Sequence, residues 1–278
     1  MSKKYTHKKK IVIGAIQLNS TNDIDKNLSV VTHLIETLNQ EMPDIIVLPE
    51  MFNYRCNNMS DAHYSETSNG KTVSWLKKIA KNHNVWIIAG SITEVSNQDK
   101  KSYNTCFVIS SEGEIINSYR KIHLFDVQLK SRKISESKNF LPGHSPTVVT
   151  INGWKIGLAI CYDLRFPELF QHYFKQDVDA ITLPSSFTFE TGEKHWHILC
   201  RARAIENQCY FIAPNQFGIG AGKKETYGHS LIIDPYGSIL SEAENPEEKI
   251  IITELNKETL ENVRSAFPLK QHKRDIFN

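Results

Sequence analysis

Short apolar segments of strand length recur along this chain and alternate with segments of helical periodicity, and this alternation constrains the fold most. The run KIVIGAIQL at 10–18 is continuously apolar, as expected of a buried strand. At 23–40 apolar residues follow at helical spacing, with Asp23 available as an N-cap. The same alternation predicts a strand at 44–50, a helix at 70–84 and a strand at 85–92.

Hairpin signals interrupt the alternation in the middle of the chain. The segment 104–121 has two strand-like runs around Ser-Glu-Gly, and 147–161 has two more around an Asn-Gly turn, whereas 126–146 is polar and predicted to be a loop. The remaining predicted elements are a helix from Pro167, a strand at 179–186, a helix at 192–207, a strand at 208–216 and a hairpin around 234–240. This mixture predicts an α/β protein whose sheets are covered by helices on their outer faces.

Composition favours an ordinary globular protein. The 278 residues are 40% hydrophobic and 23% charged, with a net charge of +2, so nothing in the charge balance points to nucleic acid as a partner. No linker or repeat divides residues 10–278, which we expect to form a single domain after a solvated basic tail at 1–9. No apolar run reaches the roughly 18 to 20 residues of a membrane span, and we therefore expect a soluble protein with no membrane partner.

The cysteines indicate a reducing compartment. They form an odd set without a CxxC pair, at positions 56, 106, 161, 200 and 209. This pattern argues against a disulfide scaffold or a zinc knuckle and favours free thiols in the cytoplasm.

Three predicted strands end in a reactive group. Glu50 follows IIVLP, Lys121 follows IINSYR, and Cys161 follows KIGLAI. Each alone has an ordinary explanation, because a Glu or Lys at a strand end is usually solvated and a Cys often fills a core. Together they supply a base, a cation and a nucleophile, which is the set that acyl transfer through a thioester requires.

The motifs around these residues resemble the nitrilase superfamily of carbon-nitrogen hydrolases. In chain order they are LPE with Glu50, YRKIHLFD with Lys121 and CYDLRFPEL with Cys161, joined by SSFTFETGEKHWHILCRARAIENQCY and YGHSLIIDPYG. The resemblance runs from about residue 10 to the HKRDIF end. It implies a four-layer α-β-β-α sandwich of two mixed sheets packed face to face, with Cys161 exposed on a sharp turn between a strand and a helix.

The resemblance also implies roles for individual residues. Glu50 would act as general base and then as acid, Lys121 would stabilise the tetrahedral intermediate, and Cys161 would be the nucleophile. The backbone N–H of Tyr162 would complete the oxyanion hole. Glu136 in ISESKNFLPG matches a second active-site Glu that orients Lys121 and the substrate, although its position also suits a surface loop. No cofactor and no metal is implied.

The substrate is expected to be a small carboxylated amide. CYDLRFPEL, RARAIENQCY and YGHS look like the branch that contains omega-amidases and deaminated glutathione amidases. Arg165 could bind a substrate carboxylate in the same pocket as Phe187 and Thr191, or could instead pair with Glu168. YGHSLIIDPYG and FPLKQHKRDIF look more like the deaminated glutathione amidases, whereas YRCNN after LPEMFN departs from the omega-amidase pattern. Deaminated glutathione is thus the first expectation, and 2-oxoglutaramate, another amide or an N-carbamoyl compound are alternatives.

Other classes of function have weaker support. A metal-dependent amidohydrolase could be argued from His195, His197 and His229, but residues two apart on a helix point away from each other. The glycines at 218–224 lack the spacing of a phosphate-binding loop. A non-catalytic binding protein with the same fold would have no reason to keep all three reactive groups.

A homodimer is also expected. The resemblance implies association through the helices at about 166–175 and 194–207. LRFPELFQHYF at 164–174, which overlaps the first of these segments, carries several large apolar residues, which suits an isologous contact between two copies.

Overall fold

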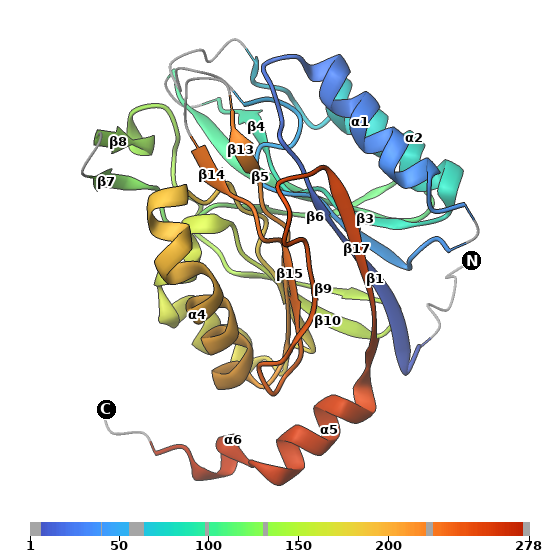
Figure 1. The fold of residues 1–278 in the computed structure, drawn as a ribbon, viewed down its shortest axis with the longest axis vertical. Coiled ribbons are helices and arrows are strands. Elements are labelled where there is room, and N and C mark those ends of the chain that lie inside the picture. The colour runs from blue at the N-terminus through green and yellow to red at the C-terminus, as the bar shows by residue number, and fades with distance from the viewer. Residues whose placement is uncertain are drawn as a thin grey trace.

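Two mixed β-sheets pack face to face, and helices cover their outer faces (Figure 1). The computed structural model describes residues 7–39, 41–55, 64–97, 100–129, 133–220 and 225–274. The two packed sheets and their outer helices confirm the predicted four-layer α/β sandwich. Residues 1–6 of the predicted basic tail, and Cys56, lie outside the described residues.

The first sheet contains the N-terminal strands, in the order β17-β1-β2-β3-β5-β4, with β6 paired to β5. Strands β1, β2 and β3 are parallel, and the other pairs are antiparallel. The strands are β1 (Lys10–Gln17), β2 (Ile45–Val47), β3 (Trp86–Ile88), β4 (Ile92–Val95), β5 (Ser102–Ile109), β6 (Ile115–Arg120) and β17 (Lys249–Asn256). Helices α1 (Ile24–Glu36) and α2 (Lys71–His83) pack on its outer face.

Alternation along the strands divides the buried side chains between two layers. In β2, Ile45 and Val47 join the larger core cluster that continues into the second sheet, whereas Ile46 joins the cluster under α1 and α2. The strand therefore has no polar face, because successive side chains point to opposite sides and both sides are covered. At the N-terminus of α1 the carboxylate of Asp23 accepts the N–H of Lys26, as its predicted capping role requires.

The second sheet carries the turn that holds Cys161. Its order is β16-β15-β12-β11-β10-β9. The strands are β9 (Thr147–Ile151), β10 (Trp154–Leu158), β11 (Ala180–Thr182), β12 (Tyr210–Ala213), β15 (Leu231–Ile233) and β16 (Ile239–Glu242). Helices α3 (Pro167–Lys175) and α4 (Phe189–Asn207) cover it, and the short 3₁₀ helix η3 (Cys161–Arg165) links β10 to α3. Asn152 and Gly153 both have positive φ between β9 and β10, which confirms the predicted Asn-Gly hairpin turn.

Several short elements and the C-terminal segment were not predicted. The expected loop at 126–146 contains β7 (Asp126–Gln128), β8 (Lys133–Ser135) and the 3₁₀ helix η2 (Glu136–Lys138), and a further hairpin is formed by β13 (Phe217–Ile219) and β14 (Glu225–Tyr227). The prediction also ended before β17 and the helices α5 (Lys257–Ala266) and α6 (Leu269–His272). Three-residue polar strands are too short to show an apolar alternation, which explains the error in the 126–146 segment. Among the described helices, none combines the length and the apolar character that crossing a bilayer requires.

Candidate active site

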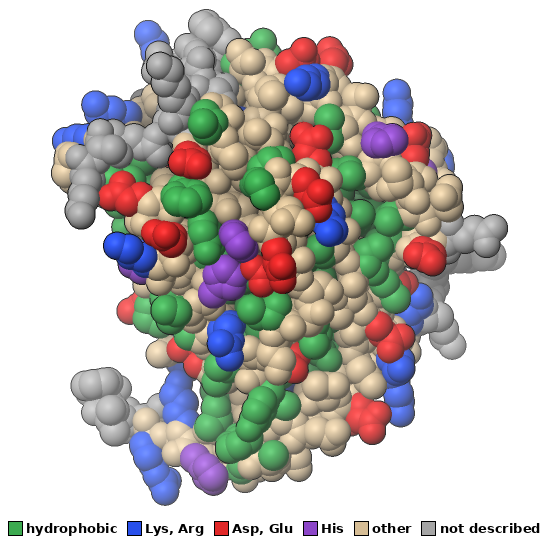
Figure 2. Space-filling view, viewed as in Figure 1, with side chains coloured by type: hydrophobic (Ala, Val, Ile, Leu, Met, Phe, Trp, Pro, Cys, Tyr) green, Lys and Arg blue, Asp and Glu red, His purple; other side chains and the backbone are tan. Residues whose placement is uncertain are grey.

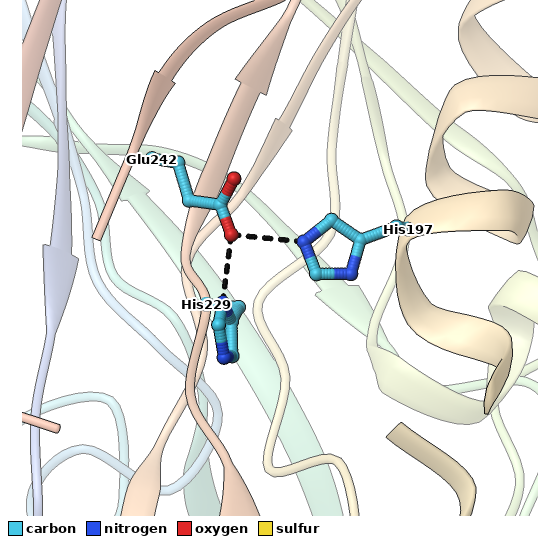
Figure 3. A group of neighbouring side chains, drawn as sticks. All are labelled: His197, His229 and Glu242. Atoms are coloured by element: carbon cyan, nitrogen blue, oxygen red, sulfur yellow. Dashed lines mark hydrogen bonds and ion pairs between the residues drawn. The ribbon is translucent and has the colours of Figure 1, made fainter. Parts of the chain in front are cut away.

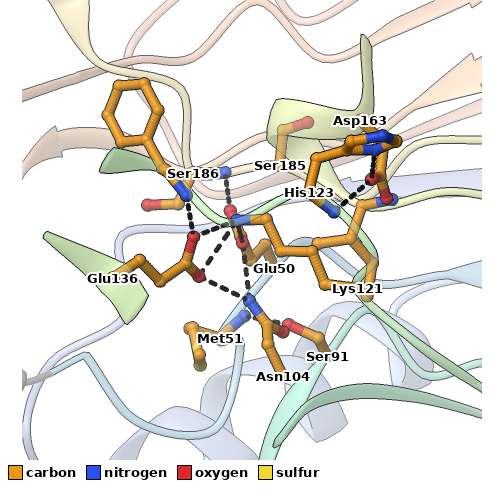
Figure 4. A network of polar contacts seen from close by, with 12 residues as sticks. Glu50, Met51, Ser91, Asn104, Lys121, His123, Glu136, Asp163, Ser185 and Ser186 are labelled. Carbon is orange, nitrogen blue, oxygen red and sulfur yellow. Dashed lines mark hydrogen bonds and ion pairs between the residues drawn. The ribbon is translucent and has the colours of Figure 1, made fainter. Parts of the chain in front are cut away.

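Glu50 lies in a buried turn just after β2. Its Oε1 accepts hydrogen bonds from Asn104 Nδ2 at 2.8 Å and from Lys121 Nζ at 3.0 Å, and its Oε2 accepts the backbone N–H of Ser186 at 2.9 Å. These donors come from β5, from the residue after β6 and from the loop after β11. Both sheets therefore hold the carboxylate in one orientation (Figure 4).

Lys121 lies between two carboxylates with 2% of its side chain exposed. Its Nζ donates to Glu50 at 3.0 Å and to the two oxygens of Glu136 at 3.0 and 2.9 Å. Burial alone would lower the pKa of Lys121, but the charges of Glu136 and Glu50 outweigh burial and raise that pKa well above its usual range. The two carboxylates therefore favour the charged form of Lys121.

Glu136 lies within this network and not on the surface. It is the first residue of η2 and is almost fully buried. Besides Lys121, its carboxylate accepts the backbone N–H of Phe125 at 2.6 Å and faces Asn104 Nδ2 at 3.4 Å. Of the two explanations that the sequence left open for Glu136, the surface loop is wrong.

Cys161 begins η3 in the left-handed region, with φ +48°. For a residue other than glycine this conformation costs on the order of 1 kcal/mol, and neighbouring contacts hold it in place. Its backbone N–H donates to the carbonyl of Pro184 at 3.0 Å, so the loop after β11 fixes the turn. The sharp turn between strand and helix is as predicted, but the side chain is 8% exposed and so is buried, not exposed as expected.

The environment of the Cys161 thiol favours its protonated form. Burial raises its pKa, and the negative charge of Glu50 raises it further. Lys121 and the N–H of Ser186 act in the opposite direction and are outweighed. The sequence predicted a cation that favours the thiolate. Lys121 has that effect, yet the thiol keeps its proton until a base removes it.

Asn104 is a buried member of the network that the sequence analysis missed. It lies in the interior of β5 and donates to both Glu50 and Glu136. An Asn is unusual in the middle of a buried strand, because the strand ladder leaves its side chain without a backbone partner. The Asn within the buried strand SYNTCFVI was therefore a signal in the sequence that could have identified this residue.

Asp163 ties the Lys121 segment to the Cys161 turn and was also missed. Its Oδ2 accepts Tyr119 Oη at 2.7 Å and the N–H of Ile160 at 2.9 Å. Its Oδ1 accepts the N–H of His123 at 3.0 Å and contacts His123 Nδ1 at 2.7 Å. Tyr119 and His123 lie two residues either side of Lys121, so one fully buried carboxylate joins the segment that carries Lys121 to the turn that carries Cys161.

Arg165 is half-buried beside the turn and does not pair with Glu168 among the described ion pairs. Its Nη2 donates to Nδ1 of His195 on α4 at 3.2 Å, and its guanidinium carbon lies 5.4 Å from the ring centre of Phe187. Phe187 therefore lies near Arg165, as predicted, whereas Thr191 pairs its hydroxyl with that of Thr188 at 2.8 Å. The Tyr162 ring packs edge-on against Phe125 and Phe166, at centroid distances of 4.8 and 5.3 Å.

One group of described side chains has the composition of a metal site, and it shares no residue with this network. It consists of His197, His229 and Glu242. As the sequence predicted, His195 and His197 point to different neighbours, because His195 contacts Arg165 and His197 contacts Glu242.

Comparison with known proteins identifies the family. Residues 12–265 match the family model for carbon-nitrogen hydrolases. The chain belongs to the carbon-nitrogen hydrolase family. An omega-amidase of Saccharomyces cerevisiae is 36% identical over 278 residues, which cover 97% of this chain and 95% of that protein. A deaminated glutathione amidase of Synechocystis sp. is 35% identical over 269 residues, which cover 95% of this chain and 98% of that protein.

The fold comparison agrees with this assignment. The crystal structure of Saccharomyces cerevisiae Nit3, a member of branch 10 of the nitrilase superfamily, matches with a TM-score of 0.86 at 32% identity, covering 100% of both chains. The predicted resemblance to the nitrilase superfamily is confirmed. This carbon-nitrogen hydrolase is accordingly an enzyme that cleaves carbon-nitrogen bonds of non-peptide amides.

Proposed function

We propose that this carbon-nitrogen hydrolase cleaves the amide of a small carboxylated substrate through a thioester on Cys161. The observation that carries the proposal is the buried group beside Cys161, in which the Lys121 ammonium lies between Glu50 and Glu136 and the charges of Glu50 and Lys121 both act on the Cys161 thiol. Moving the thiol proton to Glu50 leaves the net charge of this group unchanged, so the buried site gains no uncompensated charge.

In the first half-reaction, Glu50 takes the proton of Cys161 as the sulfur attacks the amide carbon. The carbonyl oxygen becomes an oxyanion, which the Lys121 ammonium and the backbone N–H of Tyr162 stabilise. Glu50 then gives the proton to the leaving nitrogen as the C–N bond breaks. The products are the free amine and an acyl group bound to Cys161 as a thioester.

In the second half-reaction, Glu50 takes a proton from water, and the resulting hydroxide attacks the thioester carbon. The C–S bond breaks and the proton returns to the sulfur, which releases the acid and restores the thiol. Glu136 keeps Lys121 charged and fixed in position through both halves, since it bonds to the ammonium through both oxygens.

We propose an anionic substrate, with Arg165 as the group that binds its carboxylate beside Phe187. The relatives named above support deaminated glutathione and the omega-amidase substrate 2-oxoglutaramate about equally, and the motifs YGHSLIIDPYG and FPLKQHKRDIF favour the first. Both offer a carboxylate, but they differ in the leaving amine, which is a dipeptide in the first and ammonia in the second. Comparing kcat/KM for the two compounds distinguishes these substrates.

The variant Arg165→Lys tests the anionic substrate. A lysine keeps the charge but loses the two-pronged contact, so we expect kcat/KM on the charged amide to fall by about 30- to 1000-fold, equivalent to about 2 to 4 kcal/mol. Activity on a neutral amide of similar size should be weak and should change little. Equal loss on both amides would assign Arg165 to the support of His195 and would refute its contact with substrate.

We also propose a homodimer that buries the outer face of α4. The apolar residues of LRFPELFQHYF do not carry this proposal, because Leu164, Leu169, Phe170 and Tyr173 are buried within the chain. Ile198 and Ile205, seven residues apart on α4, are 70% and 46% exposed, and hydrophobic side chains also reach the surface on the face shown in Figure 2. Sedimentation of Ile198→Glu should yield monomers where the parent protein sediments as a dimer. A parent protein that sediments as a monomer would refute this dimer.

A further inference from the structure

His197, His229 and Glu242 converge from three separate parts of the second half of the chain (Figure 3). His197 lies on α4, His229 in the turn that follows β14, and Glu242 at the end of β16. A single oxygen of Glu242 contacts His197 Nε2 at 2.9 Å and His229 Nδ1 at 2.7 Å. One ligand atom from each residue lies within 4.8 Å of the other two.

This spacing is close to that of a zinc site. Zinc bonds of about 2.0 to 2.2 Å in tetrahedral geometry hold neighbouring ligand atoms about 3.3 to 3.5 Å apart. The two contacts with Glu242, at 2.9 and 2.7 Å, would therefore widen by about 0.4 to 0.8 Å. Two imidazoles with one carboxylate are donors that zinc-like transition ions prefer, whereas magnesium and calcium prefer oxygen alone.

Neighbouring contacts already orient the two imidazoles. The Tyr227 ring stacks on His229 with 4.4 Å between ring centres, and the His197 ring stands edge-on to His229 at 5.3 Å. The buried indole of Trp196, next to His197 on α4, donates to the backbone carbonyl of His229 at 2.7 Å. The helix and the turn are thus tied together before any ion binds, which reduces the ordering that binding requires.

The cluster is open to solvent and separate from the chemistry. The side chains of His197, His229 and Glu242 are 30%, 28% and 16% exposed, which leaves room for a water as fourth ligand. Figure 2 shows histidine and acidic side chains side by side on the face that it draws. We propose that His197, His229 and Glu242 bind one zinc-class divalent ion. The ion would crosslink α4 to β16 and take no part in amide hydrolysis.

The test uses the Cys161→Ser protein, because a cysteine sulfur can also bind zinc and would add a second site. Titration with Zn²⁺ against a competing chelator should give one site per chain. His197→Ala and Glu242→Gln, each added to Cys161→Ser, should weaken binding at least about 100-fold, since loss of a supporting residue alone weakens metal sites 10- to 100-fold. Glu242→Gln keeps an acceptor for both histidines, so it retains the packing and removes the charged ligand.

His195→Ala is the matched control, because His195 is two residues from His197 on the same helix and contacts Arg165 instead. When His195→Ala is added to Cys161→Ser, the zinc affinity should equal that of Cys161→Ser alone. Co²⁺ in place of Zn²⁺ should give the visible spectrum of nitrogen and oxygen ligands in the Cys161→Ser protein, and His197→Ala should abolish it. No site in the Cys161→Ser protein, or a site that survives both His197→Ala and Glu242→Gln, would overturn the proposal.

Discussion

Two clusters in this molecule are built alike, since in each one central side chain is shared by two partners, but they differ in burial. Glu50 and Glu136 hold Lys121 where almost no solvent reaches, whereas Glu242 holds His197 and His229 at the surface. In the buried cluster each charge depends on the others, because water cannot solvate one that is left alone. In the surface cluster water can solvate a side chain that has lost its partner, so each residue depends less on the others.

The comparison predicts the largest effect at Cys161, the proposed nucleophile beside the buried cluster. Cys161→Ser should reduce amide hydrolysis by about 10⁴-fold or more, because the hydroxyl replaces the only group proposed to form the covalent intermediate. The melting temperature should change little, since the substitution keeps size and packing. Folded Cys161→Ser protein with parental turnover would end the thioester mechanism. Removing divalent ions with a chelator should leave parental turnover unchanged.

Removing the buried cation should damage both activity and stability. Lys121→Met leaves Glu50 and Glu136 facing each other without a counter-charge, so we expect turnover to fall by about 10³-fold or more and the free energy of unfolding to fall by roughly 3 to 5 kcal/mol. Adding Glu136→Gln should restore much of the stability and none of the activity. If Lys121→Met has the same urea midpoint of unfolding as the parent protein, the claim that these charges depend on one another is wrong.

The surface cluster should respond far less, and in a way set by pH. Burial alone would raise the pKa of Glu242, but hydrogen bonds from His197 and His229 lower it below its usual range. A carboxylate whose pKa is lower in the folded than in the unfolded state stabilises the fold. This stabilisation is complete above the pKa of the unfolded state, about 4.3, and is lost as the pH falls through the pKa of the folded state.

The measurement is urea unfolding of the parent and Glu242→Gln, both free of metal. The parent should be more stable by about 1 kcal/mol or less at pH 7, and the difference should shrink as the pH falls below about 4. A loss of unfolding free energy in Glu242→Gln as large as that expected for Lys121→Met would contradict the contrast between the buried and the surface cluster.

The sequence predicted those parts of the fold that local pattern determines. The apolar run of β1, the cap at Asp23 and the Asn-Gly turn before β10 each follow from neighbouring residues. The pairing of β17 with β1 along eight residues does not, because it joins chain segments more than 200 residues apart. Nothing near Lys249–Asn256 indicates which strand it will pair with.

For the active site too, the sequence predicted residues that a local motif marks and missed those whose contacts form only in the fold. Glu50, Lys121 and Cys161 were predicted because each stands at a strand end in a motif with reactive chemistry. Asn104 and Asp163 were missed because their roles exist only in the fold, where Asn104 reaches back across 54 residues to Glu50 and Asp163 across 44 to Tyr119. The burial that raises the pKa of the Cys161 thiol is likewise a property of the assembled core.

The central claim is that Glu50 is the base for a thiol that is neutral at rest. The most direct test is the rate of Cys161 alkylation by iodoacetamide as a function of pH in the parent and in Glu50→Gln, with fully buried Cys200 and Cys209 as unreactive internal controls. Because the charge of Glu50 raises the thiol pKa, its removal should shift the alkylation profile to lower pH, while amide turnover falls by about 10²- to 10⁴-fold. An alkylation profile that stays in place or moves to higher pH would contradict the account.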